Sequence, residues 1–277
     1  MELRKEKFVY YITERESIRL IKEGGLEAPW SADPVFQTTY FCNNDREHDK
    51  VTKCVRGRFD TASTYLFGEN TAAEANMVMA RMVNKIESLE ALGWPWNWWH
   101  QDMWDKVMSK EGSWGSAYIV STNGTTGPKH KYIGKLLQAV FEHFNPLSAP
   151  ALPTNLKDAH KALQGVRGLG SFMAAQVLAD LKNTKGHPLA NAEDWSTFAA
   201  PGPGSLRGLS WFHKEKITPS TFTEALQSAR RWVYNNNHTG LIEHLCNQNL
   251  QNCFCEYDKY MRVDSGQGRT KRKYNGR

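Results

Sequence analysis

Two short polar stretches contain residue types that could bind an anion together with an amine. The first, residues 41–50, is an aromatic residue, a cysteine and two amides followed by six consecutive charged residues or histidines. If the stretch is helical, Asn43, Arg46 and Lys50 share one face and Asp49 lies on another. This pattern predicts a site for an anion and an amine. A solvated helix with intrahelical ion pairs is the alternative.

The second stretch, residues 200–208, is rich in glycine and proline. Gly202 and Gly204 would let main-chain amides converge on a phosphate, Ser205 can cap a helix, and Arg207 can make bidentate contacts. The stretch lacks the lysine and the spacing of a P-loop, so a nucleotide triphosphatase is not expected. It is interpreted as an anion-binding loop, with a purely structural loop as the alternative.

A pair of short helices with a glycine turn between them lies upstream of that loop. The apolar spacing predicts helices over 155–164 and 171–183, separated by Gly168, one leucine and Gly170. Ser171 is placed to cap the second helix. This is the pattern of a helix-hairpin-helix, whose main-chain amides hold a DNA backbone without reading its sequence. An ordinary helix–glycine–helix turn is the alternative.

Asp194 follows the hairpin at the topological place where base-excision glycosylases of the helix-hairpin-helix superfamily carry their catalytic aspartate. This part of the chain resembles that superfamily, which implies a mainly α, helix-hairpin-helix DNA glycosylase-like fold. Phe172 stands where lyase-type members have a nucleophilic lysine. The C-terminal cysteines are one short of an iron–sulfur cluster and poorly spaced for zinc, so no cofactor and no metal are expected; they are Cys246, Cys253 and Cys255.

Helical periodicity dominates the rest of the chain. Further helices are expected at 3–22, 71–92, 98–108, 131–144, 220–236 and 239–262, a strand at 118–120 and a long loop at 184–219. These elements predict a single domain, 1–264, with two lobes around a cleft and the hairpin at 155–183. Residues 265–277 are expected to be a basic, disordered tail.

Tryptophans are concentrated at positions 94, 96, 98, 99 and 104. Aromatic faces can stack a base that has been extruded from a duplex. Tryptophans at helical spacing more often pack in a core, and core packing is the preferred interpretation here.

The composition is that of a globular protein, with 40% hydrophobic and 23% charged residues among 277. No apolar run is long enough to cross a membrane, and no signal peptide opens the chain. Five cysteines without an export signal indicate reduced thiols in a cytosol. The net charge of +6 comes mostly from five basic residues in 269–277. That tail could attract phosphate or merely increase solubility.

Several motifs recur in the order found in a particular family. They are Arg15-Glu16-x-Ile18, Pro29-Trp30-Ser31-x-Asp33-Pro34, Phe41-Cys42-Asn43-x-x-Arg46-Glu47-x-Asp49-Lys50, the hairpin, Gly202-Pro203-Gly204-Ser205-x-Arg207-Gly208-Leu209 and Cys255-Glu256-Tyr257-Asp258-Lys259-Tyr260. Over residues 8–262 the chain resembles the alpha-glutamyl/putrescinyl-thymine pyrophosphorylases and the helical domain of 5-hydroxymethyluracil DNA kinases. No Walker A sequence is present, which favours the transferase over the kinase.

The resemblance implies an enzyme of bacteriophage thymidine hypermodification, in the cytoplasm of the infected host. It would act on double-stranded DNA after a 5-hydroxymethyluracil DNA kinase, and displace pyrophosphate from 5-pyrophosphooxymethyl-deoxyuridine with an amine or amino acid. Asp194, and Asp49 second, are the candidate bases that keep the amine unprotonated. The candidates for pyrophosphate are Arg46, Lys50, Arg207 and Lys259. Arg15 could instead bind the carboxylate of an amino-acid donor.

Two other function classes remain open at this point. A monofunctional DNA glycosylase would use Asp194 to support a sugar cation and would leave abasic sites. A non-catalytic DNA-binding module would need the hairpin but would have no use for the motifs at 41–50 and 202–208. Glycine, glutamate and putrescine are all open as the donor.

Overall fold

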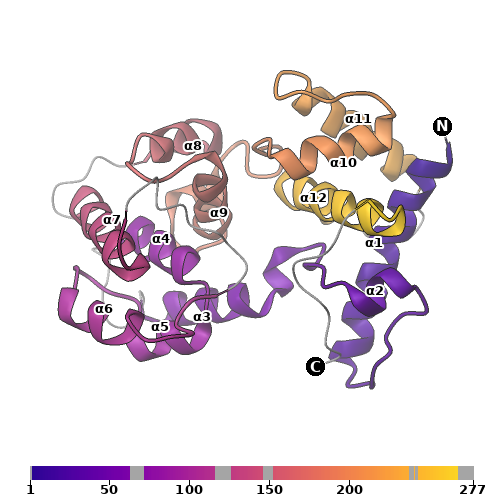
Figure 1. Ribbon diagram of the computed structural model, residues 1–277. Coiled ribbons are helices and arrows are strands. Elements are labelled where there is room, and N and C mark those ends of the chain that lie inside the picture. Colours follow the sequence, from indigo (N-terminus) through magenta and orange to yellow (C-terminus); the bar gives the residue numbers. More distant parts are fainter. Residues whose placement is uncertain are drawn as a thin grey trace. The chain divides into compact units, whose positions relative to one another are not determined.

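A computed structural model of the chain describes residues 2–62, 72–115, 126–145, 152–236, 240 and 243–267. The described residues form α-helices and short 3-10 turns and contain no β-strand, which confirms the expected mainly α class. The chain divides into two compact units (Figure 1). Unit 1 joins Met1–Asp49 to Ser196–Arg277, and unit 2 is Lys50–Trp195.

Unit 1 is organised around its last helix. Its elements are α1 (Glu2–Glu23), α2 (Pro34–Thr38), the 3-10 turn η1 (Arg46–His48), α10 (Pro203–His213), α11 (Phe222–Asn236) and α12 (Asn247–Asp264). Helix α1 ends as its sequence predicts, because Gly25 adopts a φ of +77° and the amide of Leu26 returns to the carbonyl of Ile21.

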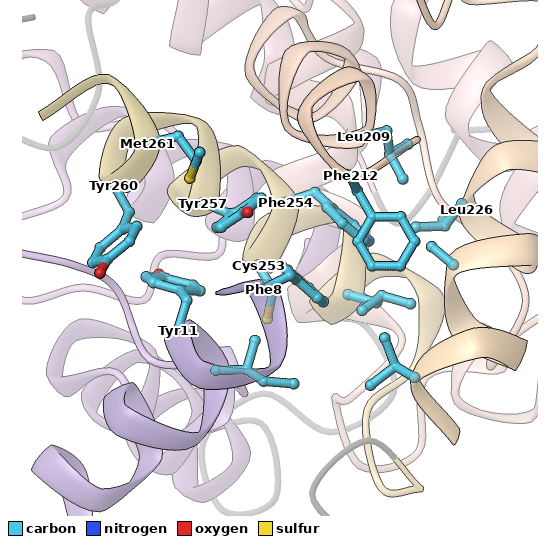
Figure 2. Packing of buried hydrophobic residues seen from close by; sticks show 14 of the residues in the cluster. Phe8, Tyr11, Leu209, Phe212, Leu226, Cys253, Phe254, Tyr257, Tyr260 and Met261 are labelled. Carbon is cyan, nitrogen blue, oxygen red and sulfur yellow. The ribbon is translucent and has the colours of Figure 1, made fainter. Parts of the chain in front are cut away.

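The core of unit 1 is an aromatic cluster between α1, α10 and α12 (Figure 2). Phe8 of α1 stacks on Phe254 of α12 with ring centroids 4.1 Å apart. Phe212 of α10 meets both rings edge-on at 5.7 and 5.5 Å. Tyr257 also packs edge-on against Phe8, and its hydroxyl donates to the Arg4 carbonyl at 2.9 Å. These rings fix the three helices against one another.

Two glycines let α10 approach α12 closely. A Cβ added at Gly204 would lie 2.4 Å from the Cys255 sulfur, and one at Gly208 would lie 1.9 Å from the carbonyl oxygen of Phe254. Only hydrogen fits at these positions, so the backbones of the two helices come together without intervening side chains.

Unit 2 contains α3 (Lys50–Ala62), α4 (Ala73–Val83), α5 (Ile86–Leu92), α6 (Gln101–Met108), α7 (Lys129–His143), α8 (Leu156–Gln164), α9 (Ser171–Leu181) and the 3-10 turn η4 (Pro188–Asn191). Inside it, Arg81 of α4 and Asp180 of α9 form an ion pair with side chains 2% and 0% exposed. Arg81 also donates to the Thr52 hydroxyl of α3 at 3.1 Å. A buried, hydrogen-bonded pair of this kind fixes three helices.

The tryptophan-rich stretch divides between core and surface. Trp94, Trp96 and Trp104 are buried, which confirms core packing for these three, whereas Trp98 is 63% exposed. The indoles are tied to the backbone, for example Trp94 to the Asn76 carbonyl at 3.1 Å.

Several element boundaries differ from those expected. The helix expected over 71–92 is two helices, because Asn84 takes a left-handed conformation (φ +46°) after α4. The helix α3 was not expected, α10 occupies the predicted loop at 184–219, and the last helix begins at Asn247 rather than 239. The expected strand at 118–120 lies outside the described residues. In the described part, no helix is both long and apolar enough to cross a membrane.

The contact at Gly208 allows a test of the α10–α12 packing. We expect Gly208→Ala to lower the free energy of unfolding by about 2–4 kcal/mol, because the new methyl group must push the two backbones apart. Gly57→Ala in α3 is the matched control, since a Cβ there meets nothing within 4 Å. That change should stabilise by roughly 0.5–1 kcal/mol. Urea titration followed by circular dichroism measures both, and equal effects would contradict the packing described.

Candidate functional site

Arg15 of α1 shapes the segment that follows α2. Its Nε donates to the carbonyl oxygens of Phe41 and Cys42, at 3.3 and 2.9 Å, and its Nη2 donates to Oδ1 of Asn43. The residue is 8% exposed, and its Nη1 has no hydrogen-bond partner. A single guanidinium therefore folds three consecutive residues around itself.

The hydrogen bonding continues from Asn43 to Asp49, the last residue of the N-terminal part of unit 1. The amide and the side-chain Nδ2 of Asn43 donate to Oδ1 of Asp49, at 3.2 and 2.9 Å. Asp45 caps the turn η1 by accepting the Glu47 amide at 2.9 Å, and it also accepts from Asn249 of α12. The segment is thus irregular around one 3-10 turn, so the helical condition for shared faces over 41–50 is not met. Side-chain bonds to Arg15 and α12 outcompete local helix formation.

The two basic residues of the stretch 41–50, Arg46 and Lys50, have different surroundings. Arg46 is buried, with 8% of its surface exposed, whereas Lys50 is exposed and begins α3 of unit 2. Lys259 of α12 pairs with Glu256 and lies 4.9 Å above the ring of Phe41. Glu256 in turn accepts the Cys42 amide at 3.2 Å. The 255–260 motif therefore reaches the 41–43 segment directly.

A cavity of about 450 Å³ opens beside this segment. Its wall contains aromatic, small polar and cationic side chains; the residues include Arg15, Lys22, Trp30, Phe36, Gln37 and Phe41. Lys22 lies 4.4 Å above the Trp30 ring. Partial desolvation, and secondarily the charge of Arg15, lowers the pKa of Lys22. We call this the Arg15 cavity.

The Arg15 cavity is bordered by the Pro29–Pro34 motif. Asp33 accepts the Val35 amide at 2.7 Å and so caps α2. Its other oxygen accepts the hydroxyls of Tyr10 and Tyr260, at 3.1 and 2.8 Å. These bonds hold one wall of the cavity on α1 and α12, and burial together with Asp33 raises the pKa of Tyr10 to about 12.

Arg207 belongs to a second cluster, centred on Asp258 of α12. Asp258 is 1% exposed, and it accepts Nε and Nη2 of Arg207 at 2.9 and 2.8 Å. The indole of Trp211 donates to its other oxygen at 3.2 Å, and Arg262 lies 3.3 Å away. Arg4 sits 5.1 Å above the Trp211 ring. This Asp258 cluster borders a hollow of about 340 Å³.

The Asp258 cluster carries an excess of positive charge at the surface. One buried carboxylate holds two guanidinium groups whose side chains are 54% and 40% exposed, those of Arg207 and Arg262. Exposed guanidinium groups with fixed orientation are suited to phosphate oxygens. Arg262 was not singled out in the sequence, although its spacing of four residues from Asp258 in a helix is the signal that could have indicated it.

The loop expected to bind an anion at 202–208 is instead the start of α10. Gly202 is the N-cap residue, and Ser205 is fully buried, its hydroxyl accepting the Gly202 amide at 3.1 Å. Gly204 faces α12, as described above. Residues 203–208 are therefore helical and not a loop, while anion binding by this stretch stays a prediction.

In unit 2, the hairpin has the helices and the apolar face that its sequence predicts. Gly168 and Gly170 are exposed, and Gly168 has a φ of +89°. The expected capping by Ser171 is wrong, because Gly170 is the N-cap of α9 and makes no side-chain cap. Ser171 instead binds His160 of α8, whose Nε2 lies 2.9 Å from the Ser171 carbonyl oxygen. Phe172 projects into solvent with 56% exposed.

Asp194 lies in unit 2, where its carboxylate contacts the first residues of α8 although it is far from them in sequence. One carboxylate oxygen accepts the amide of Leu156 at 2.7 Å, and the other accepts that of Lys157 at 2.9 Å. Asn155 caps the same helix through the Asp158 amide at 2.9 Å. Asp194 thus neutralises the positive end of α8, which gives it a structural role that the sequence did not indicate.

Most of the candidate residues fall into three groups. Asn43 belongs to the 41–43 segment of unit 1, and Arg15, Asp49 and Lys259 contact that segment. Arg207 belongs to the Asp258 cluster of the same unit. Asp194 and the hairpin glycines are in unit 2, so a single cleft lined by all of them stays a prediction.

Comparison with known proteins gives a family match over most of the chain. The family described as "5-hmdU DNA kinase, helical domain" matches residues 3–270. A 5-hmdU DNA kinase of Bacillus phage SP10 is 23% identical over 231 residues, which are 75% of this chain and 36% of that kinase. The chain thus spans about a third of the length of this relative. No solved structure matches.

The capping role of Asp194 predicts a loss of stability. We expect Asp194→Ala to lower the free energy of unfolding of unit 2 by about 1–2 kcal/mol, because two amides at the start of α8 lose their acceptor. Asp194→Asn should lose less, since its amide oxygen still accepts one bond. Glu193→Ala, at an exposed neighbour, is the control. Thermal unfolding by circular dichroism measures these changes, and an unchanged melting temperature in Asp194→Ala would contradict the capping role.

Proposed function

The chain belongs to the family of 5-hmdU DNA kinase helical domains, and we propose that it acts on a modified thymine in phage DNA. In this proposal it is an amine or amino acid:DNA transferase that follows a 5-hydroxymethyluracil DNA kinase. Its substrate is 5-pyrophosphooxymethyl-deoxyuridine in double-stranded DNA. The relative from Bacillus phage SP10 supports the setting, and the motif resemblance supports the reaction.

The observation that carries the proposal is the meeting of distant motifs in unit 1. Arg15 binds Asn43, Cys42 binds Glu256, and Asp33 binds Tyr260. Arg207 binds Asp258, which joins the 202–209 motif to the 255–260 motif. Residues separated by up to 227 positions thus surround two cation-lined hollows. A module that only holds a DNA backbone needs no such arrangement.

The proposed reaction is a substitution at the exocyclic carbon of the base. The amine nitrogen forms a bond to the methylene carbon, the bond from that carbon to the pyrophosphate oxygen breaks, and pyrophosphate leaves with the electron pair. One proton passes from the amine to a base. The exposed guanidinium groups of Arg207 and Arg262 are assigned to the departing pyrophosphate, where negative charge develops.

The two candidate aspartates lie in different surroundings. Asp194 accepts two main-chain amides at the start of α8, whereas Asp49 accepts Asn43 beside the segment that lines the Arg15 cavity. Because of this position we expect Asp49 to take the amine proton, with Asp194 as the other candidate.

Transfer itself is tested with DNA that carries the pyrophosphorylated base. The full chain is incubated with that DNA and with glycine, glutamate or putrescine, and the released nucleosides are identified by mass spectrometry. The expected product is a nucleoside carrying the amine. Abasic sites would identify a glycosylase instead, and unaltered DNA with retained binding would identify a binding module.

Variants separate the proposed base from the pyrophosphate site. Asp49→Asn should lower turnover near neutral pH by about 10²–10⁴, the contribution of a positioned general base. Raising the pH should partly restore it, because unprotonated amine becomes available from solution. Arg207→Ala should stay impaired at alkaline pH, since its defect is in pyrophosphate departure. If Asp194→Asn alone shows the loss and the rescue, Asp194 is the base.

The hairpin glycines allow a matched test of DNA binding. Gly168→Ala forces an L-residue into a left-handed conformation at a position 2.1 Å from Leu136, and we expect DNA affinity to fall about tenfold on every sequence, since the contacts are to phosphate. Gly170→Ala should also lower affinity, because this glycine belongs to the proposed phosphate contact. Gly57→Ala in α3 is the control, since a Cβ there meets nothing within 4 Å, and it should bind as the wild type. Fluorescence anisotropy with several duplexes measures all three. A loss confined to one sequence would contradict the backbone clamp.

A further inference from the structure

Arg15 makes no direct ion pair among the described residues of unit 1. Its guanidinium donates only to neutral oxygens, those of Phe41, Cys42 and Asn43, and Nη1 has no partner. The side chain is nevertheless 92% buried, as its 8% exposure shows. A buried cation without a counterion is unfavourable, so this arrangement suits a protein that receives an anion at this place.

The acidic residues nearest in sequence are engaged elsewhere. Glu16 pairs with Arg19, Glu14 accepts the Ser31 hydroxyl, and Asp33 accepts two tyrosine hydroxyls. None of the described residues that line the Arg15 cavity is an aspartate or a glutamate. The lining residues thus include two cations, Arg15 and Lys22, and no carboxylate.

The remaining wall defines the size and the body of the ligand. A volume of about 450 Å³ suits a small molecule. Trp30, Phe36 and Phe41 supply apolar faces, and the polar side chains of Gln37 and Thr39 add hydrogen-bonding groups. An anionic group with a short carbon skeleton fits this combination.

We propose that the Arg15 cavity binds the carboxylate of the amine donor, so that the donor is an amino acid and not a diamine; this rests on the proposed transferase function. A zwitterionic amino acid brings a carboxylate to Arg15 and adds no net charge. A diamine would bring two further positive charges into a cavity without acids. The multiply charged pyrophosphate is matched by the exposed guanidinium groups of the Asp258 cluster instead.

The binding experiment does not depend on turnover. The purified full chain is titrated calorimetrically with glutamate, glycine, putrescine and inorganic pyrophosphate. We expect glutamate or glycine to bind and putrescine not to bind. Pyrophosphate should bind without being displaced by the amino acid, which separates the two possible sources of the anion.

Two variants locate the binding. Lys22→Glu leaves the hydrogen bonds of Arg15 to residues 41–43 in place but replaces one of the two positive charges of the wall by a negative one. It should weaken amino-acid binding by about 10- to 100-fold, the range for a charge-assisted hydrogen bond. Lys110→Glu makes the same charge change on an exposed residue of unit 2 and should bind as the wild type. Arg15→Lys adds a direct test where circular dichroism shows a folded protein.

The proposal is overturned if the folded wild type binds putrescine more tightly than either amino acid, if it binds neither amino acid, or if Lys22→Glu binds like Lys110→Glu. Pyrophosphate that competes with the amino acid, and whose binding is lost in Lys22→Glu, would assign the cavity to the leaving group. Failure of the transferase proposal gives a different result: the amino acid binds in the Arg15 cavity, but no nucleoside adduct forms.

Discussion

The hydrogen bonds of one buried guanidinium determine the shape of unit 1 around the Arg15 cavity. Arg15 has to satisfy its donors away from water, and it does so with consecutive oxygens of the 41–43 segment. Asn43, held by this contact, then binds Asp49 at the last position of the N-terminal part of the unit. Arg15 Nη1 is left without a partner in the interior, and the same residue lines a cavity whose lining contains no aspartate or glutamate.

Helix α12 contacts the aromatic core, the arginine cluster and the 41–43 segment of unit 1, each through a different set of its side chains. Phe254 and Tyr257 pack in the aromatic core (Figure 2). Asp258 binds Arg207 and Arg262, and Glu256 binds the 41–43 segment. Two buried charged side chains of the unit, Asp258 and Arg15, have different partners. Asp258 is surrounded by guanidinium groups, whereas Arg15 has neutral partners. An anionic ligand would give Arg15 a charged partner. The arginines around Asp258 already expose positive charge to solvent.

Unit 2 has its own buried charge pair, Arg81 and Asp180, which fastens α4 to α9 and thereby supports the hairpin. The hairpin turn is exposed, and its second helix lacks a side-chain cap. Asp194 instead caps the first helix. The aspartate that follows a hairpin in sequence can thus be explained by helix stability, independently of any chemistry.

The sequence by itself determined the helical class, the hairpin helices, the end of α1 and most of the polar residues around the cavities. Such features depend on apolar spacing and on glycine or capping residues within a few positions, which are short-range effects. Arg15, Asn43 and Asp49 were recognisable as polar candidates, but not as a hydrogen-bonded chain. The tertiary structure alone decided that Gly204 and Gly208 pack helices, that 41–49 folds around one 3-10 turn, and that Arg262 joins Arg207 on Asp258. These outcomes depend on contacts between residues far apart in the chain, where a buried charge or a close backbone approach outweighs the local preference.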